Sequence, residues 1–233
     1  MKKLVLSGAI ILLATGAFAQ TNMTGADARI GIKAGINLAN INNSRNDDNQ
    51  LNTKSKNNVG YNFTVFGDFG VGNNLFIQPG ISLQNKGYKA EQVFNINGKN
   101  ISGTTTVNIM AIEVPINAVV RIPTGDVGAL QVNAGPYIGF NVSGKEKYEL
   151  AQSDGTQPVK QETTLKFGSK KESNYSSTDF GANFGLAYRT KTGILVGANY
   201  GLGLSNLIPK DKQTTNDHKA TNRVLGFTIG YSF

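Results

Sequence analysis

Eight segments of the sequence alternate between apolar and polar residues with a period of two, and none of them shows the apolar period of a helix. In the first, residues 30–38, Ile, Ala and Leu share one face while Gly, Lys and Asn share the other. The other seven segments are residues 59–71, 75–84, 112–121, 130–141, 179–189, 194–203 and 225–233. This pattern predicts an all-β chain of antiparallel strands, each with one apolar face.

The polar faces indicate which side of these strands meets water. Apart from a few charges, they hold Gly, Asn, Gln, Ser and Thr, whereas a water-facing surface is about 25–35% charged. Small uncharged residues suit the interior of a narrow barrel, and the apolar faces then meet lipid. The few charges are Lys33, Asp68, Glu113, Arg121, Asp179 and Arg189. We expect them to pair inside the barrel, with Glu113 bound to Lys33 or Arg121, because unpaired buried charge is costly.

The connections between the segments alternate in length. Residues 41–57, 91–104, 143–178 and 206–221 are long and polar, whereas residues 72–74, 123–127 and 190–193 are tight. Membrane barrels place long loops outside the cell and short turns in the periplasm. The sequence therefore predicts an antiparallel up-and-down transmembrane β-barrel of about eight strands. Pro79, Pro115 and Pro136 predict bulges or local breaks, because proline cannot donate to a strand ladder.

The N-terminus has the three parts of a secretory signal. Lys2 and Lys3 precede an apolar run, residues 4–14, and the sequence Ala17-Phe18-Ala19 forms a small-x-small cleavage site. The apolar run is shorter than the roughly 20 residues of a spanning helix. We predict a signal peptide over residues 1–19, cleaved between Ala19 and Gln20, and a barrel domain over residues 20–233. The chain has no cysteine, which excludes disulfides and thiolate metal sites.

The net charge is moderately basic. Lys and Arg number 23 against 15 Asp and Glu, a charge of +8, and loss of Lys2 and Lys3 leaves 21 against 15, or +6. This charge favours contact with outer-membrane lipid and the phosphates of lipopolysaccharide, although solubilising loop lysines explain it as well. No dense basic cluster indicates a nucleic-acid partner.

Several segments resemble the PorT-like outer-membrane β-barrel family. They are IGIKAGINLANI, FIQPGISLQNKGY, IEVPINAVVRIP, NAGPYIGFNVSG, GANYGLGLSNL and RVLGFTIGYSF, and they follow one another in the family's order over essentially the whole mature chain. The resemblance implies a place in the cell outer membrane of a Gram-negative bacterium, and prolines at these strand positions. It implies no common activity, although one namesake is associated with protein secretion. Gly80 departs from the Glu that many relatives carry there, so no role of that Glu transfers.

The last strand ends in aromatic residues. Tyr231 and Phe233 lie on its apolar face, and Phe233 is the final residue. Such an ending is similar to the signal by which the barrel assembly machinery recognises its substrates. We therefore expect the assembly machinery to be a partner, with Phe233 and Tyr231 as the assembly signal.

Candidates for catalysis or metal binding are sparse. The single histidine, His218, lies in a polar loop, and Ser205 is the nearby serine on a regular element, without a G-x-S-x-G motif. Asp47, Asp48 and Asn49 lack the spacing of a calcium loop. We expect a non-enzymatic protein with no catalytic residue, cofactor or metal site.

Three classes of function remain open. In the first, a non-enzymatic barrel binds a surface ligand or protein, or supports envelope integrity, and residues 143–178 are its main interaction surface. Within them, residues 159–167 are expected to extend the flanking strands as a hairpin. The second class is a pore or a component of secretion or transport; a pore is disfavoured because side chains fill an eight-stranded barrel. The third is a lipid-modifying enzyme built around His218.

Overall fold

The computed structural model describes residues 28–43, 53–96, 99–152, 157–213 and 219–233. The predicted signal peptide, with Ala19 and Gln20, lies outside these residues. Within them, no helix has the length and apolar character needed to cross a bilayer. The ten strands are β1 (Ala28–Asn43), β2 (Thr53–Lys56), β3 (Asn58–Gly70), β4 (Leu75–Ile96), β5 (Lys99–Pro123), β6 (Gly128–Gln152), β7 (Val159–Thr164), β8 (Thr178–Thr190), β9 (Ile194–Gly203) and β10 (Ala220–Ser232). Two short 3-10 helices, η1 (Gly125–Val127) and η2 (Lys210–Lys212), complete the described elements.

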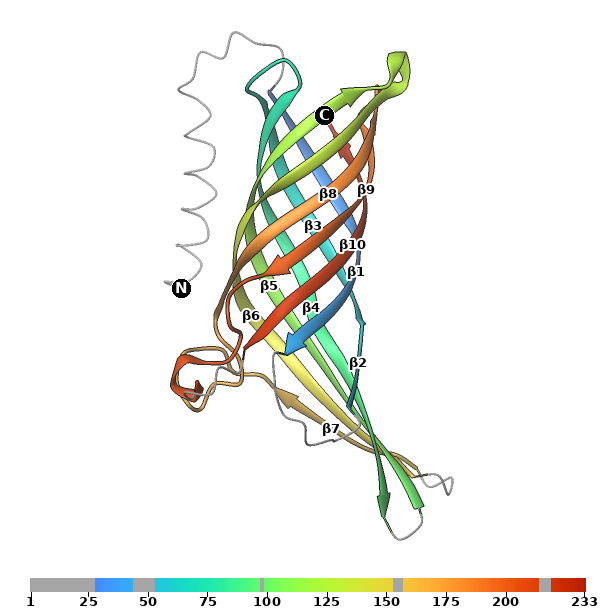
Figure 1. Ribbon diagram of the computed structural model, residues 1–233, viewed down its shortest axis with the longest axis vertical. Coiled ribbons are helices and arrows are strands. Elements are labelled where there is room, and N and C mark those ends of the chain that lie inside the picture. Colours follow the sequence, from blue (N-terminus) through green and yellow to red (C-terminus); the bar gives the residue numbers. More distant parts are fainter. Residues whose placement is uncertain (1–27, 44–52, 97–98, 153–156, 214–218) are drawn as a thin grey trace.

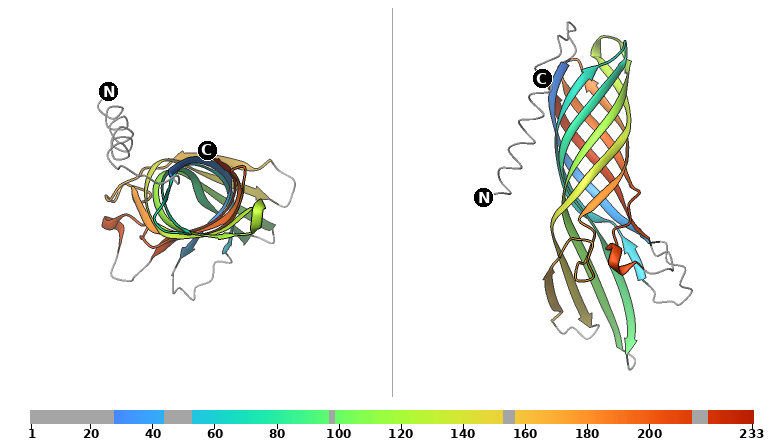
Figure 2. Two further views of the ribbon diagram at one scale, coloured as in Figure 1. Left: turned by 90° about the horizontal axis from the view of Figure 1, so that it is seen from above. Right: turned by 90° about the vertical axis from the view of Figure 1, so that its left-hand side faces the viewer.

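Eight of these strands form a closed antiparallel ring. The pairing runs β1, β3, β4, β5, β6, β8, β9 and β10, and β10 then pairs with β1 to close it. The closing register runs from Gly31 opposite Ser232 to Asn43 opposite Ala220. Viewed along its axis, the ring encloses a narrow interior (Figure 2). The predicted all-β, up-and-down barrel is confirmed, with eight strands in the ring.

The two ends of the barrel differ. At one end, here called the turn end, short connections join β3 to β4, β5 to β6 and β8 to β9. The second of these contains η1 and is closed by a hydrogen bond from Thr124 N to Gly128 O, 2.9 Å. Ala28 and Phe233 lie at the same end (Figure 1). The prediction of tight turns at residues 72–74, 123–127 and 190–193 is confirmed.

At the other end, here called the sheet end, three strands continue far beyond the ring. β4 and β5 stay paired up to Ile96 and Lys99 and project farthest from the barrel (Figure 1). β2 pairs with the extension of β4, and β7 pairs with the extension of β6. We call β2, β7 and the parts of β4, β5 and β6 beside them the protruding sheet.

Three of the predicted long loops therefore contain strands, because β2 also lies within residues 41–57. Residues 91–104 were expected to form a long loop, and this is wrong, because they lie mostly in the β4–β5 hairpin. In residues 143–178, β6 continues to Gln152 and β7 covers Val159–Thr164, so the predicted strand extension is confirmed there. Apolar alternation could not reveal these strands, because neither face of the protruding sheet meets lipid.

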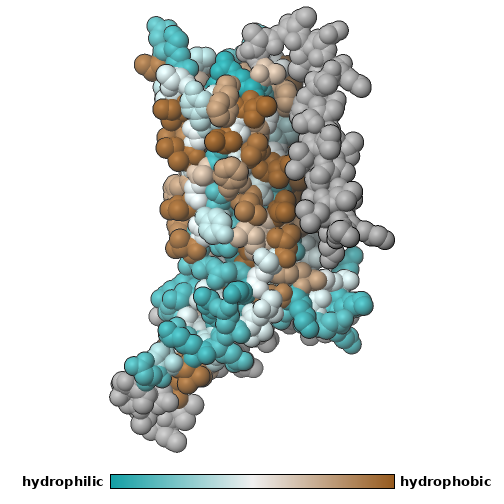
Figure 3. Space-filling view, turned by 180° about the vertical axis from the view of Figure 1, so that it is seen from behind, coloured by the Kyte–Doolittle hydropathy of each residue, from teal (hydrophilic) through white to brown (hydrophobic). Residues whose placement is uncertain are grey.

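The ring carries a belt of exposed apolar side chains. They come from every strand of the ring, and examples are Ile36, Phe63, Ile116, Leu186 and Ile229. Figure 3 shows the belt as a brown band between polar ends. Polar residues of the same strands, such as Asn37, Gln78 and Gln131, are buried inside. The predicted assignment of the two faces is confirmed, since lipid-facing strands are apolar outward and polar inward.

The strand prolines break the ladders locally without shifting their register. Between β4 and β5, pairing is interrupted at residues 80–81 and 114–115, and between β5 and β6 at residues 116–117 and 135–136. The predicted local breaks are confirmed. Bulges at the prolines are not found, because the register shift between β5 and β6 lies at Met110 and Ala111, where β6 has the extra residue Val142.

Candidate functional site

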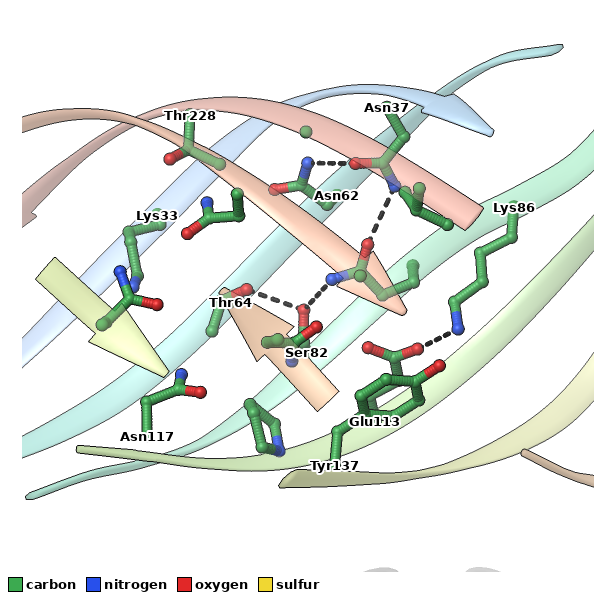
Figure 4. Close-up of a pocket in the computed structure, with 18 residues that line it drawn as sticks. Lys33, Asn37, Asn62, Thr64, Ser82, Lys86, Glu113, Asn117, Tyr137 and Thr228 are labelled. Atoms are coloured by element: carbon green, nitrogen blue, oxygen red, sulfur yellow. Dashed lines mark hydrogen bonds and ion pairs between the residues drawn. The ribbon is translucent and has the colours of Figure 1, made fainter. Parts of the chain in front are cut away.

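Polar side chains fill the middle of the barrel around a cavity of about 80 Å³. Its lining includes the amides of Asn37, Asn62, Asn117, Asn133, Asn183 and Asn199, and two lysines, Lys33 and Lys86 (Figure 4). A buried water needs roughly 10–15 Å³ by this measure, so the cavity has room for a handful of waters. One of these would satisfy Asn117 Oδ1, which is buried and has no partner among the described residues.

Hydrogen bonds between side chains join three neighbouring strands across this interior. Asn62 Nδ2 donates to Asn37 Oδ1 at 2.7 Å, and Asn37 Nδ2 donates to Gln84 Oε1 at 2.8 Å. Gln84 Nε2 in turn donates to Ser82 Oγ at 2.8 Å, and Ser82 shares a 2.7 Å bond with Thr64. Figure 4 shows this chain running along one wall of the cavity. Such a satisfied network holds the strands in a single register.

An ion cluster lies toward the sheet end of the interior. Lys86, from β4, pairs with Glu113 of β5 and with Asp179 of β8, at 3.0 Å from the latter. All three side chains are almost fully buried. The Lys86 ammonium also lies 4.9 Å from the centre of the Tyr137 ring. Glu113 does pair, as expected, but the expected partners Lys33 and Arg121 are wrong, because the register brings Lys86 to it instead.

Asp179 is the most connected group of this cluster. Besides Lys86, it accepts hydrogen bonds from Ser205 Oγ at 2.6 Å, Asn222 Nδ2 at 2.8 Å and Tyr137 OH at 3.2 Å. Four strands or their ends therefore converge on one carboxylate. Ser205 also accepts a hydrogen bond from Phe180 N at 3.0 Å. Its hydroxyl therefore donates to Asp179 and accepts from the backbone, so both hydrogen bonds hold the fold together.

A second ion pair lies toward the turn end. Asp68 of β3 pairs with Arg121 of β5 and accepts a hydrogen bond from Gln78 Nε2 at 3.1 Å. The Arg121 guanidinium stacks on the Phe76 ring, 3.6 Å from its centre. Lys33 has no carboxylate within pairing distance among the described residues, and its ammonium lies 4.5 Å from the centre of the Phe66 ring. The polar cavity thus lies between two ion clusters that span the barrel.

Beyond the belt, an apolar cluster fills the sheet end of the barrel. Its buried members are Ile41, Val107, Ile109, Leu165, Leu207 and Ala220, and Tyr88 and Tyr175 pack against them. The two tyrosine hydroxyls lie 3.1 Å apart. Burial raises the pKa of both phenols, so they stay neutral at physiological pH. This cluster joins residues 165–177 and 204–213 to the barrel wall and covers the ion cluster beneath.

The protruding sheet has one face of alternating charge. Lys145 and Lys147 of β6 pair with Glu162 of β7 at 2.6 and 3.6 Å, and Lys160 of β7 pairs with Glu149 of β6 at 3.2 Å. The hydrogen bond from Lys145 lowers the pKa of Glu162, which keeps this carboxylate charged. All six side chains of β7 are exposed. The sheet is therefore the large, charged and accessible surface of the described chain.

The predicted assembly signal lies at the turn end. The rings of Tyr231 and Phe233 meet edge to face with centroids 5.1 Å apart, and Phe233 is 67% exposed. Phe233 N donates to Ile30 O at 2.8 Å, which fixes the C-terminus on β1. His218 and the residues 47–49 lie outside the described residues. Among the described residues, no group of acidic or histidine side chains has the geometry of a metal site.

Sequence reasoning places Tyr137 on the polar face of residues 130–141 without singling it out, and it misses Lys86 and Asn222. Lys86 has the same strand parity as Gln78, Ser82 and Gln84, so continuing the inward face by one step would have placed it inside. Asn222 lies between residues 206–221, the predicted loop, and residues 225–233, the predicted strand, and so belongs to neither. Neither Lys86 nor Asn222 lies within an apolar alternation, the pattern that predicts the strands.

The chain belongs to the outer membrane protein beta-barrel domain family, whose model matches residues 18–209. With the closed ring and its apolar belt, this places the protein in the cell outer membrane. No curated protein matches the chain.

Solved structures similar to it include Ail, the attachment invasion locus protein of Yersinia pestis, at 17% identity over 89% of this chain and 99% of that one, with a TM-score of 0.43. Neisserial surface protein A is similar at 11% identity over 87% and 95%, TM-score 0.38. OprG of Pseudomonas aeruginosa is similar at 10% identity over 88% and 96%, TM-score 0.32. These likenesses are too distant to transfer any activity.

Proposed function

We propose that the protein is a non-enzymatic outer-membrane protein of a Gram-negative bacterium that binds a ligand or a protein at the cell surface through its protruding sheet. In this proposal the sheet end faces outward, the turn end faces the periplasm, and residues 143–178 form the main contact surface. The observation that carries it is the contrast between a barrel filled with side chains and an exposed five-stranded sheet beyond the belt.

The filled interior argues against a pore. Two buried ion clusters and the apolar cluster lie across the barrel, and the cavity between them has a volume of only about 80 Å³. A conducting pathway would require several of these contacts to open together. In planar bilayers we therefore expect no stepwise conductance from the purified protein, and regular single-channel steps would refute the proposal.

An enzyme built around His218 is the alternative of a different class. The geometry of Ser205, the candidate nucleophile, argues against it, because its hydroxyl donates a hydrogen bond to Asp179 within the buried ion cluster. Outer-membrane lipid profiles by mass spectrometry should be identical for the wild type and His218→Ala. A role in secretion, as for one namesake of the PorT-like family, rests on the sequence resemblance alone.

Other partners proposed for the chain follow from its location. The belt would contact outer-membrane lipid, and the net positive charge of the chain favours the phosphates of lipopolysaccharide. The barrel assembly machinery would recognise Tyr231 and Phe233 during insertion. The signal peptide of residues 1–19 would direct export before either contact forms.

Protease added to intact cells tests the orientation. The exposed strand β7 presents the side chains of Lys160 and Glu162 to a protease outside the cell. We expect cleavage within residues 143–178 while the ring stays in the membrane. Cleavage that occurs only after lysis would mean that the sheet end faces the periplasm, and the proposed surface role would be wrong.

A further inference from the structure

One edge of β7 is unpaired. β7 pairs through one edge with β6, from Lys145 opposite Thr164 to Leu150 opposite Val159, and no described strand pairs with its other edge. The edge is accessible, since every side chain of the strand is exposed. An open strand edge presents backbone donors and acceptors to any strand of matching register.

The hydrogen bonding of β7 shows which residues present these groups. Leu165 N donates to Gly144 O at 2.9 Å, so the backbone groups of the odd-numbered residues point toward β6. Because these directions alternate along a strand, the N–H and C=O groups of Lys160 and Glu162 point toward the free edge. Pro158, which follows the same parity, has no N–H and limits further pairing.

The side chains of the same two residues select one register. If a second β7 pairs antiparallel with Gln161 opposite Gln161, then Lys160 of each copy lies opposite Glu162 of the other. Shifting this register by one hydrogen-bonding step in either direction places Lys160 opposite Lys160, or Glu162 opposite Glu162. Like charges directly opposite one another destabilise a strand pair, so the centred register is favoured.

We propose that β7 is a self-association edge, at which two copies of this chain pair antiparallel about Gln161. The pairing is isologous, with a two-fold axis through the Gln161 position. The pairing extends an existing charge pattern across the strands. Glu149 of β6 lies beside Lys160 of β7, which lies beside Glu162 and then Lys147 of the second copy. Four backbone hydrogen bonds and an unbroken alternation of sign cross the interface. The protruding sheets of the two copies become one continuous sheet.

The geometry also sets the orientation of the two barrels. β6 leaves the barrel, β7 returns toward it, and an antiparallel second β7 runs the opposite way. The two-fold axis is perpendicular to the sheet, and therefore lies across the barrel axis and inverts the second barrel. Two copies paired in this way belong to two facing membranes. This step rests on the proposed function, because it requires the sheet end to face outward.

Each contact is small. A pair of strands with four backbone hydrogen bonds lies well below the roughly 1,200 Å² of a stable interface, so one pair of copies binds weakly. Many copies in two apposed membranes bind together far more strongly than one pair, because each contact raises the effective concentration for the next. The inferred contact therefore joins cell surfaces rather than forming a permanent dimer.

An engineered cysteine tests the register directly, since the chain has no cysteine of its own. Residues opposite one another at a non-hydrogen-bonded position have Cα atoms about 4.5 Å apart, within disulfide range. Full-length Gln161→Cys protein, concentrated in detergent and oxidised, should form disulfide dimers. Val159→Cys is the matched control, exposed on the same face, because its copies would lie four residues out of register. Equal dimer yield from the two variants, or none from Gln161→Cys, would overturn the pairing.

Charge reversal supplies the second test, in the Gln161→Cys background. Lys160→Glu alone and Glu162→Lys alone should each reduce dimer yield at least tenfold, because like charges then face one another. Mixing the two variants should restore the yield, since each charge again meets its opposite. Loss of yield without recovery on mixing would mean that the charges do not face one another as proposed.

The cell experiment separates this inference from the proposed function. Two cell populations carrying differently tagged Gln161→Cys protein should form mixed dimers upon contact. Dimers in detergent without mixed dimers between cells, together with cleavage only after lysis, would refute the outward orientation. The same absence with cleavage on intact cells would refute pairing between membranes.

Discussion

Replacing Lys86 by methionine removes the cation of the buried cluster while keeping most of the side-chain volume. Glu113 then loses its ion-pair partner, whereas Asp179 keeps its three donors Ser205, Asn222 and Tyr137. Removing one member of a buried pair costs about 3–5 kcal/mol, because the other charge is left uncompensated. Glu113 borders the polar cavity, where water can reach it, so we expect the lower end, about 3 kcal/mol.

The assay is urea unfolding in lipid vesicles, with folded and unfolded barrels separated by gel mobility. The double variant Lys86→Met with Glu113→Gln should recover more than half of the loss, since it removes the stranded charge. Lys145→Met, the same substitution at an exposed ion pair, should leave the transition in place. If Lys86→Met also leaves it in place, the Lys86–Glu113 pair does not stabilise the barrel. If the double variant is no better than the single one, the uncompensated Glu113 charge is not the cause of the loss.

Three further predictions concern other parts of the chain. Intact mass of membrane-extracted protein should show that the mature chain begins at Gln20, and retention of residues 1–19 would contradict the signal peptide. Deleting Phe233 should lower the outer-membrane level several-fold while costing the inserted barrel less than the roughly 1.5–3 kcal/mol of a fully buried ring, because Phe233 is 67% exposed. The contribution of the Glu162 ion pairs to folding stability should be complete above the ordinary Glu pKa of 4.5. It should be lost as the pH falls through the lowered pKa of Glu162 in the folded protein. Titration of its side-chain carbon by NMR should show that midpoint, and Lys145→Ala should move it upward.

The lipid-facing part of the fold was predictable because lipid enforces alternation. Residues 30–38 and 225–233 follow the period-two pattern throughout, and they form β1 and β10 of the ring. The tight turns were predictable because a turn must interrupt that pattern. The polar face could be assigned to the barrel interior because it carries few charged residues.

The protruding sheet was not predictable in this way. Lys89, Glu91, Thr104 and Thr106 lie on strands, but water solvates them as readily as loop residues, so no apolar period marks them. The identity of the ion-pair partner of Glu113 also depends on the register of the strands, because the register brings together residues far apart in sequence. Lys86 and Asp179 are 93 positions apart, and only the closed ring brings them to 3.0 Å.

The register shift between β5 and β6 decides which way the β6 extension faces. Up to Phe140, even-numbered residues of β6 face lipid, but beyond Val142 the odd-numbered Lys145 faces outward. Without the extra residue, Lys145 would lie opposite the fully buried Val107, and the charged face would be turned into the apolar cluster. The extra residue Val142 thus reverses which side chains of β6 face outward. Below it the outward side chains are apolar and meet lipid, and above it they are charged and meet water.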